Sequence, residues 1–389
     1  MHVTRTLITI GLALTVAGTA TAGATAGSAT AKCRESVPFQ SGVGGYASYR
    51  IPAVVEAADG AVLAFAEGRR GGSSDTGDID IVLRKSTDGG CTWGPQQLVA
   101  DHGTNTIGNP APVVDPASGD LVLLSVRNGP VTEAQILRGE ASPEDSRRVF
   151  VQRSTDDGKT FSAPQELTSA VKLPDWRWYA TTPGHGIALR SGRLLIPANH
   201  SIAPPAGSTD TGAEAKYYGG HSLYSDDGGR TWQIGYVDDK PDGYINVNES
   251  TAAQLPDGRV YFNTREHNGT APGNRADAYS LDGGKTLQKP FRPQATLVGP
   301  VVQASLLSIR DLLIYSGPAD PAARAAMTLR VSKDNGVTWE SALAISGLPA
   351  AYSDLVDLDQ NTVGLLYETG DFGANETITF RRLAVKDLR

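Results

Sequence analysis

The chain repeats one eight-residue phrase five times, first as STDGGCTW over Ser86–Trp93. The phrase returns as STDDGKTF, SDDGGRTW, SLDGGKTL and SKDNGVTW, at Ser154–Phe161, Ser225–Trp232, Ser280–Leu287 and Ser332–Trp339. The shared skeleton, S-x-D-x-G-x-T-aromatic, has the chemistry of a turn. Its Asp accepts hydrogen bonds from its own loop, and its Gly supplies an unusual φ angle. Repeats at spacings of 52 to 71 residues indicate a modular fold, such as a propeller or a solenoid.

A second series of tight turns alternates with the first, and a short apolar run follows most of them. These turns fall at Asp59-Gly60, Ser118-Gly119, Ser191-Gly192, Asp257-Gly258, Arg310-Asp311 and Gln360-Asn361. Short apolar runs joined by small turns are typical of β-hairpins. Six hairpins, five of them followed by the eight-residue phrase, predict an all-β fold, a six-bladed β-propeller with about four strands per sheet. The expected domain covers residues 33–389 without an internal linker.

Residues 1–32 differ from the rest of the chain. Arg5 precedes the apolar run Leu7–Val16, and a tail of small residues follows, which is the pattern of a secretory signal peptide. Possible cleavage sites end at Ala22, Ala26 and Ala31. Ten apolar residues are too few to span a bilayer, so we expect no membrane span and a secreted mature protein.

Cysteine count and net charge restrict the remaining chemistry. Cys33 and Cys91 are the two cysteines of the chain. In an oxidising compartment the sequence allows two alternatives, one disulfide or two free thiols. The net charge of −7 argues against a nucleic-acid partner. The six histidines show no metal-ligand spacing, so the sequence predicts neither a metal site nor a cofactor.

The order of the strands within a blade determines at which of its two ends each residue lies. If a blade runs strand, tight turn, strand, loop, strand, repeated phrase, strand, both kinds of repeated turn lie at one end. The start of each first strand, the end of each second strand and the following loop then lie at the opposite end. The repeats are therefore scaffold, and a functional site is expected at the opposite rim.

Charged side chains gather at that rim. Arg50, Arg265 and Arg324, from three different blades, are predicted to converge on one axis, with Glu249 and Glu368 nearby. Guanidinium forks bind carboxylates through paired hydrogen bonds, whereas converging guanidiniums without an anion would repel one another. A single surface arginine would mean little, but three at matching positions predict an anionic ligand.

Ordered motifs at the same rim resemble those of bacterial exo-α-sialidases (neuraminidases) with Asp-box, or BNR, repeats. They are YRIP at 49–52, GDIDIVLRKS at 77–86, NEST at 248–251, NTRE at 263–266 and AYSDL at 351–355. The resemblance covers about residues 36–385. The Asp box alone also occurs in non-enzymatic propellers, whereas the ordered set of motifs is specific.

The resemblance implies a catalytic role for three residues. Tyr352 would be the nucleophile, Glu249 its partner and Asp75 the acid/base. Asp78 lies in the same loop as Asp75, and Asp80 is expected within the following strand. Asp75 is chosen because its spacing to VLRK matches the family.

The resemblance also implies the residues that bind the sugar. Arg50, Arg265 and Arg324 would hold the sialic acid carboxylate, and Glu368 would orient Arg50. Arg69 resembles the family's contact near the 4-hydroxyl, and Asn109 aligns with a position that lines the N-acetyl pocket.

A tyrosine nucleophile suits this substrate. The anomeric carbon of a sialoside already bears a carboxylate, so an anionic nucleophile would approach against that charge, whereas a phenol is neutral until it attacks. The sequence thus predicts a retaining exo-α-sialidase acting on sialylated glycans, glycoproteins or glycolipids. The alternatives are a trans-sialidase, including the intramolecular kind, and a sialic-acid-binding propeller without turnover.

Overall fold

The structure of the chain is a computed structural model, which describes residue 1 and residues 33–238, 245–267 and 272–389. The predicted leader therefore lies outside the described residues, apart from Met1. Residues 33–389 form one compact unit built almost entirely of antiparallel strands. No helix among the described residues has the length and apolarity to cross a membrane.

The first sheet has eight strands, more than any other. Its strands are β2 (Ser48–Glu56), β3 (Val62–Arg69), β4 (Ile79–Ser86), β5 (Gln97–Ala100), β6 (Thr106–Val114), β7 (Leu121–Asn128), β8 (Arg148–Ser154) and β9 (Gln165–Glu166). It consists of two antiparallel four-stranded halves, which meet where β4 and β6 pair in parallel at Ile79 and Thr106. A short helix, α1 (Glu133–Arg138), lies in the loop between β7 and β8, and α2 (Thr168–Val171) follows β9.

Four smaller sheets follow in chain order. The second sheet contains β10 (Trp176–Thr181), β11 (Ile187–Ala188), β12 (Leu194–Ile202), β13 (Tyr218–Ser225) and β14 (Gln233–Asp238). The third contains β15 (Val247–Gln254), β16 (Val260–Glu266), β17 (Arg275–Ser280) and β18 (Arg292–Pro293), and the fourth contains β19 (Ser305–Ile309), β20 (Leu312–Pro318), β21 (Met327–Ser332) and β22 (Glu340–Ala344). The fifth contains β23 (Ala350–Asp359), β24 (Thr362–Thr369), β25 (Thr377–Ala384) and β1 (Glu35–Gln40). The described residues also form three short 3₁₀ helices, η1 (Ala215–Tyr217), η2 (Pro272–Asn274) and η3 (Val385–Leu388).

The fold is propeller-like and all-β, as the repeats predict, but the sheet count differs. Hydrogen bonds group the described strands into five sheets, whereas the sequence predicts six separate ones. The reason is the parallel contact between Ile79 and Thr106, which joins two hairpin units into one sheet. A periodic sequence pattern locates hairpins, but it does not reveal a pairing between the edges of neighbouring units.

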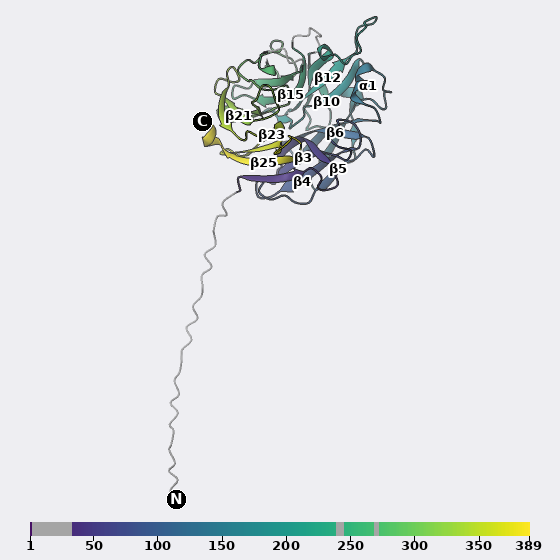
Figure 1. The fold of residues 1–389 in the computed structure, drawn as a ribbon. Coiled ribbons are helices and arrows are strands. Elements are labelled where there is room, and N and C mark those ends of the chain that lie inside the picture. The colour runs from purple at the N-terminus through teal and green to yellow at the C-terminus, as the bar shows by residue number, and fades with distance from the viewer. Residues whose placement is uncertain (2–32, 239–244, 268–271) are drawn as a thin grey trace. The chain divides into compact units, whose positions relative to one another are not determined.

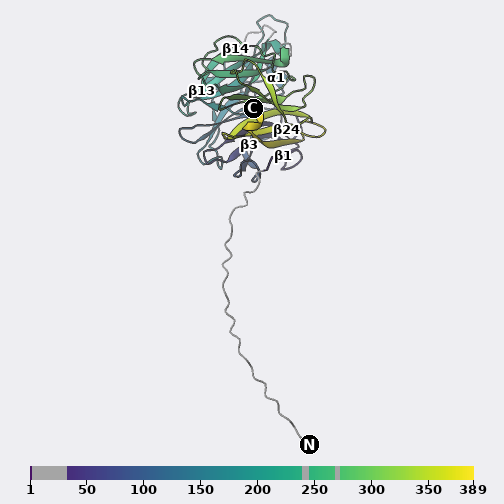
Figure 2. The same ribbon diagram turned by 90° about the vertical axis from the view of Figure 1, so that its left-hand side faces the viewer.

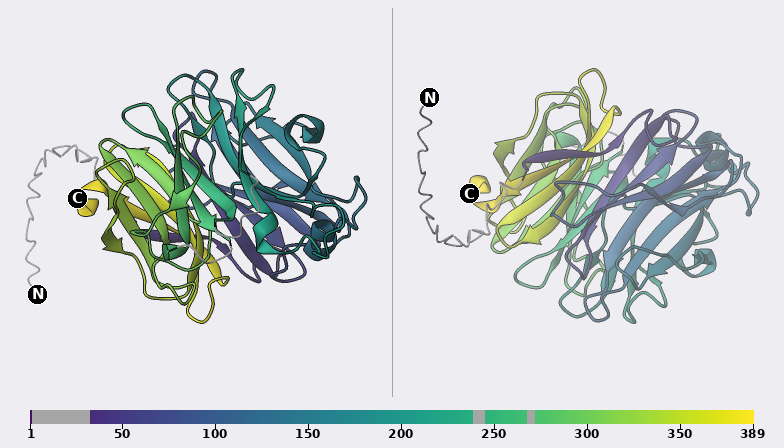
Figure 3. Two further views of the ribbon diagram at one scale, coloured as in Figure 1. Left: turned by 90° about the horizontal axis from the view of Figure 1, so that it is seen from above. Right: turned by 90° about the horizontal axis from the view of Figure 1, so that it is seen from below.

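The two ends of the chain meet in the last sheet. Strand β1 pairs with β25, so the N-terminal strand completes a sheet formed by C-terminal strands. Figure 2 shows β1 on the same side of the molecule as β3 and β24. Figure 3 shows the purple early strands next to the yellow late ones, and β2 contacts β23. Cys33 and Cys91 form a disulfide, which ties the start of β1 to the first repeated turn.

The five Asp boxes share one hydrogen-bond pattern. In the first box, Thr92 donates from its backbone N–H to Asp88 Oδ1 at 2.9 Å and from its hydroxyl to Oδ2 at 2.7 Å. Gly90 has a φ of 87°, and a Cβ there would come within 2.1 Å of Phe380. Trp93 stacks edge-on against Phe380 at 5.5 Å between ring centroids. These turns are scaffold, as the sequence indicates.

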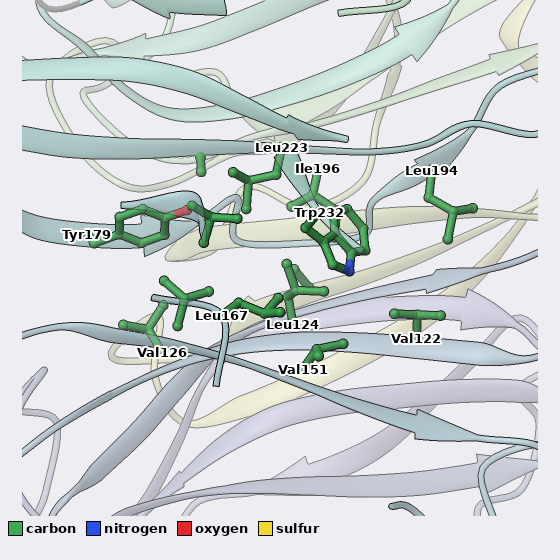
Figure 4. Close-up of a cluster of buried hydrophobic side chains, with 14 of the residues drawn as sticks. Val122, Leu124, Val126, Val151, Leu167, Tyr179, Leu194, Ile196, Leu223 and Trp232 are labelled. Atoms are coloured by element: carbon green, nitrogen blue, oxygen red, sulfur yellow. The ribbon is translucent and has the colours of Figure 1, made fainter. Parts of the chain in front are cut away.

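Apolar side chains fill the space between successive sheets. Figure 4 shows one such cluster, in which Leu124 and Val151 of the first sheet face Ile196 and Leu223 of the second. Trp232, the aromatic residue of the third Asp box, closes this cluster. Burial of large side chains at about 1.5–3 kcal/mol each makes such interfaces the main stabilising contacts between sheets.

A buried carboxylate joins four parts of the propeller near its centre. Asp354 of β23 accepts hydrogen bonds from Val54 N–H of β2, from the His185 backbone N–H and from the Ser305 hydroxyl of β19, at 2.8 to 2.9 Å. His185 also places Nδ1 2.7 Å from Asp354. Because these partners come from separate sheets, the contacts fix the first strands relative to one another. Those first strands carry much of the rim.

Candidate active site

A cavity of about 300 Å³ opens at the rim opposite the Asp boxes. Its wall includes eight of the nine residues singled out from the sequence, which are Arg50, Arg69, Asp75, Asn109, Glu249, Arg265, Arg324 and Tyr352. The ninth, Glu368, is fully buried behind Arg50. The structure therefore brings together residues that are spread over more than 300 positions of sequence.

Bulges at the starts of first strands aim four of these side chains into the cavity. The pairing register shifts between Arg50 and Ala53 in β2, and equivalent shifts occur at Asn109 in β6, at Glu249 in β15 and at Tyr352 in β23. A bulge re-aims the residues within it and bends the strand. The backbone at Ile51 and Asn109 has positive φ angles of 58° and 52°, which is uncommon for such residues.

Tyr352 and Glu249 line the cavity and contact each other. The phenol of Tyr352 donates a hydrogen bond of 2.5 Å to Glu249 Oε1, and Glu249 Oε2 pairs with Arg265 Nη1 at 2.9 Å. Burial raises the pKa of Tyr352 well above its usual value, and the charge of Glu249 raises it further. Arg265 and Arg50 act in the opposite direction. The phenol is thus neutral at rest and already in contact with a base.

Two guanidiniums lie near the Tyr352 ring, and a third binds the carboxylate that accepts from its hydroxyl. The guanidinium carbon of Arg50 lies 5.2 Å from the ring centroid, and that of Arg324 lies 5.8 Å from it. Arg265 reaches the same ring through Glu249. The side chain of Arg324 is exposed, and one Nη donates to Val301 O at 3.3 Å. Such a cluster attracts a carboxylate.

Glu368 supports both Arg50 and the strand that carries Tyr352. One of its oxygens accepts from Arg50 Nε at 2.8 Å and from Ile51 N–H at 2.9 Å. The other accepts from Tyr352 N–H at 3.2 Å. The predicted contact between Glu368 and Arg50 is therefore present, and the same carboxylate also holds the backbone of Tyr352.

The surroundings of Asp75 differ from those of Asp78 and Asp80. It lines the cavity, its side chain is more than half exposed, and its carboxylate pairs with Arg69 at 2.8 Å. Burial by itself would raise the pKa of Asp75, but the charges of Arg69 and Arg50 outweigh it and hold the pKa below its usual value. Asp78 pairs instead with Arg70, and Asp80 lies in β4, as expected, where it accepts from Tyr46.

One side of the cavity consists of residues that the sequence did not single out. Glu133 of α1 accepts a hydrogen bond from the Tyr218 hydroxyl at 3.1 Å. Arg147 is buried and lies over the Trp178 ring, 3.8 Å from its centroid. His267 completes this side. For Glu133 and Arg147 the available signal was the long segment between β7 and β8, which begins and ends at the rim.

Known proteins resemble this chain in sequence over most of its length. Residues 60–365 match the family model of the BNR repeat-like domain. The chain is 32% identical to a sialidase of Micromonospora viridifaciens, over 92% of this chain and 56% of that protein. It is 30% identical to an exo-alpha-sialidase of Aspergillus fumigatus, over 84% of this chain and 80% of that protein.

Solved structures with a similar fold include a sialidase and a trans-sialidase. The Hadza microbial sialidase Hz136 matches with a TM-score of 0.77 and 27% identity, over 89% of this chain and 67% of that one. A leech intramolecular trans-sialidase matches with a TM-score of 0.73 over 92% of this chain and 71% of that one, but at 17% identity it shows the fold alone.

The fold and the rim site define an Asp-box propeller protein. The chain belongs to the sialidase family with BNR repeats. It spans little more than half the length of the Micromonospora relative.

Proposed function

We propose that the chain is a secreted, retaining exo-α-sialidase that releases terminal sialic acid from glycoconjugates through a covalent tyrosyl intermediate. The observation that carries the proposal is the Tyr352–Glu249–Arg265 chain of hydrogen bonds, set beside Arg50 and Arg324. This arrangement offers a carboxylate-binding cluster next to a neutral nucleophile that already contacts a base. A sialic acid residue presents its carboxylate on the carbon that is attacked, so the two features serve one substrate.

The first chemical step forms the tyrosyl bond. The Tyr352 oxygen attacks the anomeric carbon while its proton passes to Glu249, 2.5 Å away. The bond to the glycosidic oxygen breaks, and Asp75 supplies the proton to the leaving alcohol. Because Arg69 and Arg50 lower the pKa of Asp75 and keep it ionised in the free enzyme, Asp75 first takes up this proton from solvent. Negative charge develops on the Tyr352 oxygen only as its proton passes to Glu249, so the nucleophile is activated at the moment of attack.

The second step reverses these roles with water. Asp75, now a carboxylate, takes a proton from water, whose oxygen attacks the anomeric carbon on the side that the leaving group vacated. The bond to Tyr352 breaks, and Glu249 returns the proton to the phenolate oxygen. Two displacements at one carbon retain its configuration.

The architecture we propose has six blades. The eight-stranded sheet divides into two antiparallel halves, β2 to β5 and β6 to β9, which are linked by a single parallel contact. Each half has the order of strands and Asp box that three of the four smaller sheets show. If the halves count as separate blades, six first strands supply the rim.

We also propose export after removal of a leader within residues 1–32. A disulfide between Cys33 and Cys91 supports this proposal, because structural disulfides persist in oxidising compartments. Sequencing the N-terminus of exported protein should give a start between Gly23 and Cys33. A start at Met1 would contradict it.

The decisive experiment incubates the purified mature chain with a sialoside and follows the products over time by proton NMR. Free sialic acid that appears first as the α-anomer is the expected result, and a first-formed β-anomer would exclude retention. A sialylated acceptor or an anhydro sugar as main product would favour the trans-sialidase alternatives. Binding without turnover would favour the non-catalytic propeller.

A further inference from the structure

Arg69 makes an unusual set of contacts with the loop that carries Asp75. Its Nη1 donates to the backbone oxygens of Ser73 and Ser74 at 2.6 and 2.9 Å and pairs with the Asp75 carboxylate at 2.8 Å. One nitrogen of this side chain therefore contacts three consecutive residues. The guanidinium is almost fully buried, with 2% of the side chain exposed.

The rest of the guanidinium is held from behind by a second buried residue. Glu67 accepts from Arg69 Nε at 3.0 Å and from Nη2 at 2.6 Å through the same oxygen. Its other oxygen accepts from the Asn109 N–H at 2.8 Å. Every nitrogen of the Arg69 guanidinium thus donates to a protein partner, and Glu67 fixes its orientation relative to the neighbouring β6.

Other contacts hold the loop on either side of Asp75: the Ser48 hydroxyl donates to Gly72 O at 2.6 Å, and the Gly77 N–H donates to the Thr106 hydroxyl at 3.0 Å. Gly71, Gly72 and Gly77 have open space around the positions where a Cβ would lie, and Gly72 and Gly77 have positive φ angles. Glycine leaves the backbone the greatest conformational freedom. At the base of the loop, Arg70 pairs with Asp78 and Asp80 at 3.2 and 3.1 Å. These contacts close the base but do not reach Asp75.

We propose that Arg69 is a positioning residue, which holds the 73–75 segment so that the Asp75 carboxylate faces the glycosidic oxygen. This inference rests on the proposed function, in which Asp75 is the acid/base. It differs from the role that the family resemblance implies, a contact near the 4-hydroxyl of the sugar. Four of the five N–H groups of this guanidinium already donate to protein oxygens, which leaves a single N–H on Nη2 for a sugar hydroxyl.

The two roles predict different kinetics. A positioning residue for the acid matters when the leaving group needs a proton, and it matters little when the leaving group departs unaided. Sialyllactose releases an alcohol that must be protonated, whereas an aryl sialoside with a 4-nitrophenyl group releases a stable phenolate. A residue that contacts the sugar would affect both substrates equally, because the sialic acid is the same.

The test measures kcat/KM for both substrates with Arg69→Met and with Arg69→Lys, which keeps the charge but not the fork. We expect the loss on sialyllactose to exceed the loss on the 4-nitrophenyl sialoside by about 10²-fold or more in Arg69→Met, as for loss of general acid catalysis. The affinity of a dehydrated sialic acid inhibitor should change little. Because both rates scale with the amount of folded enzyme, their ratio is independent of partial unfolding.

Arg148→Met serves as the matched control, because Arg148 pairs with Glu166 at a partly exposed position outside the cavity. Its ratio should equal that of the wild type. Equal losses on the two substrates in both Arg69 variants, or weakened inhibitor binding that explains the losses, would overturn the positioning role and restore the sugar contact. Failure of the wild type to hydrolyse either substrate would instead overturn the proposed function.

Discussion

The phenol of Tyr352 and the carboxylate of Glu249 are 103 residues apart in sequence and share a hydrogen bond of 2.5 Å. Each residue lies in a bulge at the start of a first strand, in β23 and in β15. The two bulges bring together residues from separate sheets, and Arg265 from β16 holds the second oxygen of Glu249. The site is therefore assembled at equivalent positions of different hairpin units.

Replacement of Tyr352 by Phe is expected to lower kcat by at least about 10³-fold, because it removes the attacking oxygen and keeps the ring. Binding of a sialic acid analogue should persist through the arginines. A 3-fluoro sialosyl fluoride should label the wild type at Tyr352, which peptide mass spectrometry can locate. Tyr279→Phe, which also loses a hydroxyl contact but lies away from the cavity, is the control. Labelling of Asp75 or Glu249 would show a carboxylate nucleophile instead.

Truncation of Arg265 or Arg324 to Ala should cost about 2–5 kcal/mol of transition-state binding, as for other desolvated charge pairs. That corresponds to a loss of roughly 10²- to 10³-fold or more in kcat/KM. Loss of Arg265 also leaves Glu249 without its cation, so this variant should show the larger fall in kcat. Steady-state kinetics with a fluorogenic sialoside measures both. Near-native activity in either variant would exclude a carboxylate-binding role for that residue.

The Cys33–Cys91 disulfide should stabilise the fold without affecting catalysis. It joins the segment before β1 to the first Asp box, and a bridge closing a loop of 58 residues is worth typically 2–4 kcal/mol. The double variant Cys33→Ser, Cys91→Ser should therefore unfold at lower denaturant concentration, with an unchanged kcat/KM for the folded protein. Two free thiols in mass spectra of non-reduced wild-type protein would contradict the bridge.

A buried pair of histidines should make the fold sensitive to acid. His200 and His221 place their Nδ1 atoms 3.0 Å apart, and His200 stacks on Trp176 with ring centroids 3.9 Å apart. Burial lowers the pKa of His200 to about 3, and that of His221 falls well below 6.5. Both are thus neutral in the fold, whereas the unfolded chain binds protons below about pH 6.5. The free energy of unfolding should fall as pH drops from about 6.5 toward 3.

Denaturant titrations at several pH values measure this effect. His200→Gln should show a shallower loss of stability with falling pH than the wild type, whatever its stability at neutral pH. His102→Gln, at a partly exposed position outside this pair, should keep the wild-type slope. An unchanged slope in His200→Gln would mean that other groups cause the acid sensitivity.

Local sequence patterns were sufficient to predict the hairpin units and the end of the propeller where the site lies. The Asp-box turns depend on contacts within eight residues, such as those of Asp88 with Thr92, so their geometry is encoded locally. The alternation of two turn types then places Arg50, Glu249 and Tyr352 at one rim through chain direction alone. The bridge between Cys33 and Cys91, left open by the sequence, is present in the structure.

Contacts between units were decided by the tertiary structure alone. The parallel pairing at Ile79 and Thr106, which merges two hairpin units into one sheet, has no signal in either unit. The bulges that aim the site residues, and the contact of Glu67 with the Asn109 N–H that fixes the Glu67–Arg69 pair against β6, also depend on neighbours distant in sequence. A repeated motif determines the local structure of each hairpin unit. The register between strands and the partner of each buried charge are set only when the units pack together.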